Sequence, residues 1–200
     1  AARLQGVHDN RLRISAFSGS GIETTFTQGE DQCLASMVPD LPELEAGNQR
    51  LMVVGTLADI VEEQFRRHFA QLGIDHVDFF PAARADDLPP VGPGTRLLLA
   101  QPFVSDTVQA LCKRGAKVIP SLYPLGVQGT LAWFQAAAAE WGMDAESVSA
   151  ALAIPVARAQ KAVARVRENL KDKTIHFLPD SQLEIPLARF LRDECGMSLT

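Results

Sequence analysis

The stretch "LMVVGTL", residues 51–57, decides the fold class of this 200-residue chain. A short, continuous apolar run that ends in Gly and Thr is typical of a strand buried on both faces of a parallel sheet. The residues that follow change to a helical period, with apolar side chains at Val61, Phe65, Phe69 and Leu72. Gly73 then predicts the end of that helix. A buried strand followed by an amphipathic helix indicates an α/β fold.

The same alternation continues downstream of this unit. Three more apolar strands are expected in "IDHVDFFP", "TRLLLAQP" and "AKVIPSL". The helix predicted after the last of them carries Trp133, Phe134 and Trp141 at helical spacing, which indicates core packing. Four strands with their helices in roughly a hundred residues match the size of one doubly wound domain with a parallel sheet.

A long helical region extends this domain. Its second helix is predicted to begin at Pro155, a residue suited to a first turn. One face of that helix carries the apolar residues Ala159, Val163, Val166 and Leu170. This stripe predicts a helix packed on the domain through one side.

The flanking sequences indicate two incomplete domains of the same architecture. "RLRISAFSG" predicts a strand and "TFTQGEDQCLASMV" its helix, whereas residues 39–49 are rich in Pro, Gly and acidic residues without period. "KDKTIHFLPDS" returns to strand. We therefore expect the end of a first domain in 1–40, a linker in 41–49, a second domain with its helical extension in 50–172, and the start of a third in 173–200.

Composition excludes several functional classes. The net charge of -5 and the absence of any long basic run argue against nucleic acid as a partner. No apolar run approaches the roughly 20 residues that span a membrane. The N-terminal "AARLQGVHDNRLR" lacks the apolar core of a signal peptide. We expect a cytoplasmic protein without a membrane span.

The cysteines do not predict a metal site. Cys33, Cys112 and Cys195 lie far apart, share no C-x-x-C spacing, and are expected on helices as buried or half-buried side chains. The four histidines are equally scattered. No self-contained metal site is expected from these residues.

The segment "SGSGIETTFTQGED", residues 18–31, is polar and rich in glycine. It matches neither the dinucleotide fingerprint nor a P-loop. The simplest interpretation is a tight turn followed by a helix capped by Thr27, with Glu30 as the reciprocal partner three residues on. The adjacent carboxylates of Glu30 and Asp31 point about 100° apart on a helix. They are expected to favour the helix dipole rather than to form an acid–base dyad.

Three longer strings carry a resemblance to a known family. "GSGIETTFTQGEDQCLASMVP", "AQPFVSDTVQALCKRGAKVIPSLYPLGVQGTLAWF" and "FLPDSQLEIPLARFLRDECGM" resemble, in order and spacing, the N subunits of light-independent (dark-operative) protochlorophyllide reductases. That family is similar to the molybdenum–iron protein of nitrogenase. The resemblance implies Rossmann-like doubly wound parallel sheets in a multi-domain architecture, of which this chain would be a fragment.

The resemblance also implies an activity, cofactors and partners. The family performs the ATP-dependent reduction of the C17–C18 double bond of protochlorophyllide, giving chlorophyllide in bacteriochlorophyll biosynthesis. N and B subunits form an N2B2 heterotetramer, and an L protein dimer supplies electrons and uses the ATP. A [4Fe-4S] cluster is held by three N-subunit cysteines and a B-subunit aspartate. The matching cysteines would lie upstream of Ala1, so no metal ligand is expected in this chain.

The resemblance gives the loop at 18–25 a second interpretation. In doubly wound domains the loop after a strand faces the ligand crevice, where cluster and tetrapyrrole would lie. Ser20, Glu23, Thr24 and Thr25 are therefore candidate substrate-binding residues; catalytic residues stay unassigned. Three alternatives remain at this stage: a stand-alone αβ module binding a nucleotide or sugar nucleotide, a subunit of the related chlorophyllide reductase, or a purely structural subunit. A glycine fingerprint followed by an acidic residue, which the module would need, is not present.

Overall fold

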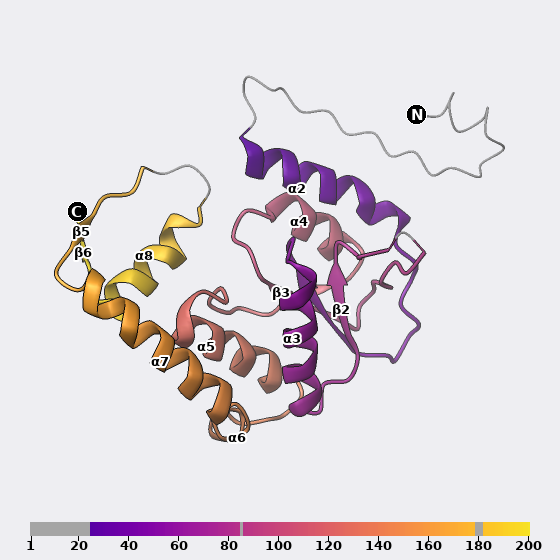
Figure 1. Cartoon of the computed structure of the whole chain (residues 1–200). Coiled ribbons are helices and arrows are strands. Elements are labelled where there is room, and N and C mark those ends of the chain that lie inside the picture. Colours follow the sequence, from indigo (N-terminus) through magenta and orange to yellow (C-terminus); the bar gives the residue numbers. More distant parts are fainter. Residues whose placement is uncertain (1–24, 85, 179–181) are drawn as a thin grey trace.

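The computed structural model describes residues 25–84, 86–178 and 182–200, and a parallel four-stranded sheet lies at its centre (Figure 1). The strand order is β2-β1-β3-β4. The strands are β1 (Arg50–Val54), β2 (Val77–Phe80), β3 (Thr95–Leu99) and β4 (Lys117–Val118). In the register, Val53 lies opposite Phe79 on one side and Leu98 on the other. The four predicted strands and the α/β class are confirmed.

Alternate residues of β1 build two separate cores. Leu51 and Val53 point into one apolar cluster, and Met52 and Val54 into the other, because successive side chains of a strand face opposite sides of a sheet. All four are fully buried. The continuous apolar run is thus explained by helices that cover both faces of the sheet.

Two helices cover each face. The first pair is α2 (Phe26–Met37) and α4 (Ser105–Lys113), and the second is α3 (Asp59–Gln71) and α5 (Gly126–Ala139). α2 and α4 run side by side on one side of the sheet (Figure 1). In the other layer Phe65, Phe69, Trp133 and Phe134 form an aromatic cluster. The Trp133 indole also donates to the Leu99 carbonyl at 2.8 Å, so its predicted core position is confirmed.

The elements that follow lie outside the sheet body, which is the four-stranded sheet with the helices α2 to α5. A short helix α6 (Ala145–Ala151) leads into α7 (Ala153–Leu170), and β5 (Thr174–Ile175), α8 (Glu184–Asp193) and β6 (Ser198–Leu199) follow. β5 and β6 form a separate parallel pair. The apolar stripe predicted for α7 is only partly covered: no residue of α7, all of which are described, is buried, and Val166 is 50% exposed.

The proposed linker at 41–49 is fastened to the sheet body. Leu44 and Val91 are joined by a backbone hydrogen bond of 3.1 Å, and Val91 donates back to Pro42 at 3.0 Å. The Arg114 guanidinium donates to the carbonyls of Leu41 and Pro42. These contacts hold the connection in place; the domain boundaries themselves remain a proposal.

Candidate functional site

The carboxyl edge of the four-stranded sheet is where a doubly wound domain binds its ligand. In the order β2-β1-β3-β4, the connections after β1 and β3 run in opposite directions, so the switch point lies between these two strands. Here the Gln101 side chain fills the space: its Oε1 accepts from the Thr56 backbone at 2.8 Å, and its Nε2 donates to the Thr56 carbonyl at 3.2 Å. A Cβ at Gly55 would lie 2.9 Å from Gln101 Oε1. The loops after β1 and β3 are therefore joined by hydrogen bonds across the switch point.

The amino end of α4, which follows β3, receives a carboxylate from α2. Val104 precedes α4 and has no polar side chain with which to cap it. Instead, Asp31 accepts from the backbone of Asp106 and Thr107 at 2.8 Å each, and from the Thr107 hydroxyl at 2.6 Å. Asp31 is only 4% exposed. A helix amino terminus is a ready anion site, and here the anion is an aspartate from another helix.

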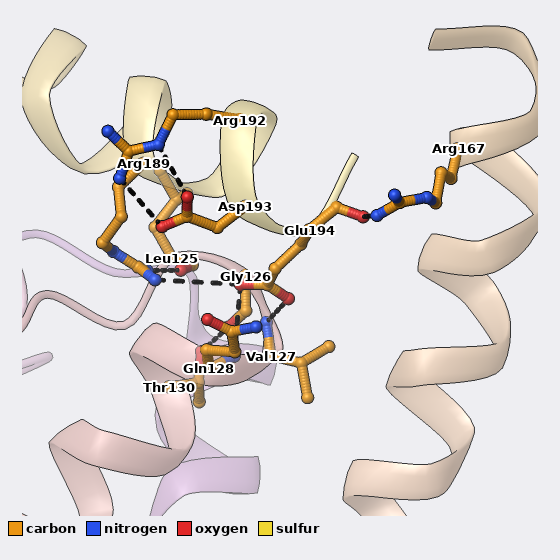
Figure 2. A network of polar contacts seen from close by, with 10 residues as sticks. All are labelled: Leu125, Gly126, Val127, Gln128, Thr130, Arg167, Arg189, Arg192, Asp193 and Glu194. Atoms are coloured by element: carbon orange, nitrogen blue, oxygen red, sulfur yellow. Dashed lines mark hydrogen bonds and ion pairs between the residues drawn. The ribbon is translucent and has the colours of Figure 1, made fainter. Parts of the chain in front are cut away.

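The amino end of α5, which follows β4, also receives a carboxylate from a distant segment, in this case from the C-terminal part of the chain (Figure 2). Glu194, just after α8, accepts from the backbone of Val127 at 2.7 Å and of Gln128 at 3.2 Å. Arg189 of α8 donates to the Leu125 carbonyl at 2.7 Å and lies 3.9 Å from the Glu194 carboxylate. Leu125, like Val104, cannot cap its own helix.

Two glycines of α5 allow this close approach. Gly126 has φ +73°, a conformation that favours glycine, and a Cβ there would collide with Glu194 and Phe190. A Cβ at Gly129 would collide with Arg189 and lie 2.7 Å from the Tyr123 carbonyl. Side chains at either position would push α8 away from α5.

The remaining helix of this edge does not attract anions either. α3 follows β1, is preceded by Ala58, and carries Asp59 and Glu62 in its first turn. Burial raises the pKa of Glu62, with Arg66 opposing the shift. Acidic residues at a helix amino terminus occupy the place that a phosphate would take. Taken together, the described residues of this edge hold protein segments by polar contacts and offer a nucleotide no open phosphate site.

The predicted substrate loop lies mostly outside the described residues. Ser20, Glu23 and Thr24 belong to the part that the structure leaves out. Thr25 is the N-cap of α2: its hydroxyl accepts from the Gln28 backbone at 3.3 Å, and the Gln28 side chain accepts from the Thr25 backbone at 3.0 Å. The prediction that Thr27 caps this helix with Glu30 was wrong by two residues. Thr27 lies inside the first turn instead, within 3.1 Å of the Thr25 hydroxyl.

The predicted partner of Asp31 was also wrong, because Asp31 was expected to interact with the dipole of its own helix. Asp31 does act on a helix amino terminus, but on that of α4, because the packing of α2 against α4 brings it there. Glu194 and Gln101 carried no sequence signal, since the amide groups they bind are more than 40 residues away. A capping motif reports only on its own helix.

The cysteines do not fit an iron–sulfur cluster. Among the described residues no three His, Cys, Asp or Glu side chains converge on one point. Cys33 is half-buried and Cys195 buried, as predicted, but Cys112 is exposed, contrary to prediction. Cys195 also lies just after α8 rather than on a helix. Burial raises the pKa of the Cys195 thiol, aided by Glu194, which disfavours the thiolate that a metal needs. No step is assigned to a cluster held by these residues.

Comparison with known proteins gives consistent matches over the whole chain. The family of nitrogenase component 1 type oxidoreductases matches residues 2–200. Light-independent protochlorophyllide reductase subunit N of Halorhodospira halophila is 55% identical over 98% of the chain and 46% of its own length. The subunits N of Acidiphilium rubrum and Rubrivivax gelatinosus are each 53% identical, over 100% and 98% of the chain. The chain spans about half the length of these relatives. Within the described residues, no helix is both long and apolar enough to cross a membrane.

Proposed function

Because the chain belongs to the nitrogenase component 1 type oxidoreductases, we propose that it is part of the catalytic component of a light-independent protochlorophyllide reductase. The reaction would be the ATP-dependent reduction of the C17–C18 double bond of protochlorophyllide. The match at 55% identity to a subunit N, along nearly the entire chain, is the observation that carries this proposal.

The geometry of the sheet edge argues against the nucleotide-binding alternative. A stand-alone module would need an open switch point and a free helix amino terminus for phosphate. In this chain Gln101 occupies the switch point. Asp31 and Glu194 occupy two of the helix amino termini. No observation favours a chlorophyllide reductase subunit, since the curated relatives bear the other name.

Cofactor and partners follow from the same proposal. The [4Fe-4S] cluster would be held by residues outside this chain, with a B subunit completing an N2B2 complex and an L protein supplying electrons at the expense of ATP. The loop at 18–25, with Ser20, Glu23, Thr24 and Thr25, would face protochlorophyllide. Of these, Thr25 has its hydroxyl engaged in the cap of α2, which leaves Glu23 as the side chain best suited to a test.

A chimera tests the proposal. The matching segment of the H. halophila subunit N is replaced by residues 1–200, the product is assembled with its B subunit, and protochlorophyllide consumption is measured with L protein and ATP. We expect assembly and turnover. A chimera that assembles but does not consume protochlorophyllide contradicts the proposed activity.

The same chimera tests the loop. Glu23→Ala should lower turnover without affecting assembly, whereas the matched control Thr27→Ala should leave both unchanged. Equal turnover in the two variants would remove Glu23 from the substrate site while leaving the proposed activity intact.

A further inference from the structure

We infer that Glu194 acts as a polar latch that fixes the C-terminal segment (173–200) on the sheet body, and that this segment, unlike α2, can be released by loss of a single charge. The Glu194 latch consists of Glu194 and Arg189 on one side and of the backbone at Leu125, Val127 and Gln128 on the other. The inference rests on a difference between the two carboxylates that close the helix ends.

The Asp31 contact is backed by apolar packing. Leu34, Val38 and Leu41 are buried in the same cluster as the β1 residues Met52 and Val54. Arg114 of the sheet body also donates to the Val38 carbonyl at 2.9 Å. Losing the Asp31 charge would therefore leave α2 attached through the hydrophobic core.

The Glu194 latch has less apolar support: Phe190 of α8 lies against Gly126 of α5 and Cys195 is buried, but neither belongs to the two apolar clusters. Among the described residues, none beyond Val156 belongs to either apolar cluster. In α8 the buried residue is Pro186, while Ile185 is 76% exposed. Charged hydrogen bonds therefore carry a larger share of the attachment of α8 to α5 than of α2 to α4. Such bonds are individually stronger than neutral ones but are lost with one charge.

α7 contacts the Glu194 latch at one point and lines a groove along its length, and this groove leaves room for the C-terminal segment to move. Arg167 of α7 donates to the Glu194 carbonyl at 2.9 Å, and the Asp172 backbone, just after α7, donates to the Gly196 carbonyl at 3.0 Å, so α7 and the C-terminal segment are joined. A groove of about 780 Å³ lies between α3, α5 and α7, with Phe190 of α8 in its lining. Its walls are largely apolar and include Phe65, Phe134, Val156 and Val163. A close-packed interior would prevent a shift of α7, whereas this groove permits one.

Hydrogen exchange of the whole chain, read by mass spectrometry, tests the latch. Glu194→Gln keeps the size of the side chain and removes its charge, and it should speed amide exchange in α8 and at Val127 and Gln128 by about tenfold or more. Glu63→Gln is the matched control, because it makes the same change at an exposed carboxylate that pairs with Arg67 within α3. It should leave exchange in α8 unchanged.

Two further variants make the result decisive. Arg189→Gln removes the other charge of the latch and should release α8 as Glu194→Gln does, whereas Asp31→Asn should speed exchange at the start of α4 and leave α8 protected. Unchanged exchange of α8 in both Glu194→Gln and Arg189→Gln would overturn the latch. Equal acceleration in α8 and in β1 would also overturn it, since that pattern means unfolding of the whole chain.

Discussion

Single side chains close the helix ends of this protein in two ways. Thr25 and Asp144 bind the amides of the helix that directly follows them, whereas Asp31 and Glu194 bind amides of helices distant in sequence. The need is the same in both cases, because the first N–H groups of a helix have no partner within it. The local caps stabilise one helix each, and the distant ones also join segments.

The Thr25 cap can be tested against its neighbour. Thr25→Ala should lower the free energy of unfolding by about 1 kcal/mol, because the Gln28 amide loses its acceptor. Thr27→Ala should change it by less than about 0.5 kcal/mol, since alanine favours the helix interior. Urea denaturation of both variants checks this. An equal loss of unfolding free energy in the two variants would indicate that Thr27 is the cap after all.

Asp144 predicts a pH dependence. Its carboxylate accepts from the Ser147 backbone and hydroxyl at 2.8 Å each, and these bonds lower its pKa below the ordinary 3.8. A depressed folded-state pKa stabilises the protein above the unfolded-state pKa, and this contribution is lost as pH falls through the folded-state value. The stability difference between wild type and Asp144→Asn should be constant above about pH 5 and shrink below 3.8.

Thermal midpoints of both proteins between neutral pH and the acid range provide the measurement. Asparagine is also a good N-cap, so the comparison isolates the charge. A difference that does not vary with pH would show that the Asp144 charge does not contribute.

At the scale of secondary-structure elements, packing determines whether a position inside a helix requires glycine. Gly29 in α2 and Gly129 in α5 both lie inside helices. An added Cβ at Gly29 meets no atom within 4 Å, whereas one at Gly129 meets Arg189 and the Tyr123 carbonyl. The same residue type is thus dispensable in one helix and required in the other, where α8 and the preceding loop approach α5.

Alanine at these two positions should have opposite effects. Gly29→Ala should raise the free energy of unfolding by up to about 1 kcal/mol through helix propensity. Gly129→Ala should lower it by about 1–3 kcal/mol through overpacking. Urea unfolding of the pair measures both. Stabilisation by Gly129→Ala would mean that α8 does not pack on α5 as described.

At the scale of the whole molecule, the chain is organised around one sheet edge. Asp31 of α2 and Glu194, just after α8, each bind the amino terminus of a helix that begins there. The edge that binds ligands in many doubly wound proteins here binds neighbouring segments.

This organisation predicts the behaviour of the chain with iron. Anaerobic incubation with ferrous iron and sulfide, followed by desalting, should leave no stoichiometric cluster, because no three ligands converge in the described part of the chain. Iron analysis and visible absorption measure the outcome, with the H. halophila subunit N assembled with its B subunit as positive control. A stable cluster on residues 1–200 would contradict the prediction.

Much of the fold could be predicted from particular residues. The apolar run at β1 and the period of α3 indicated the parallel sheet, and the spacing of Trp133 and Phe134 indicated the core. Less of the site could be predicted. Thr25, rather than Thr27, proved to be the cap, because helix starts are set within a turn by local geometry that several nearby threonines satisfy equally well.

The sequence by itself determined the α/β class, the order of strands and helices, and the family, because these depend on short-range periodicity and on strings of residues that stay together along the chain. Only the tertiary structure decided that Gln101, Asp31 and Glu194 close the sheet edge. Their partners lie 45 to 76 positions away in the sequence. A carboxylate's local sequence gives no sign of which distant amides it will meet, since that is fixed by how the helices pack.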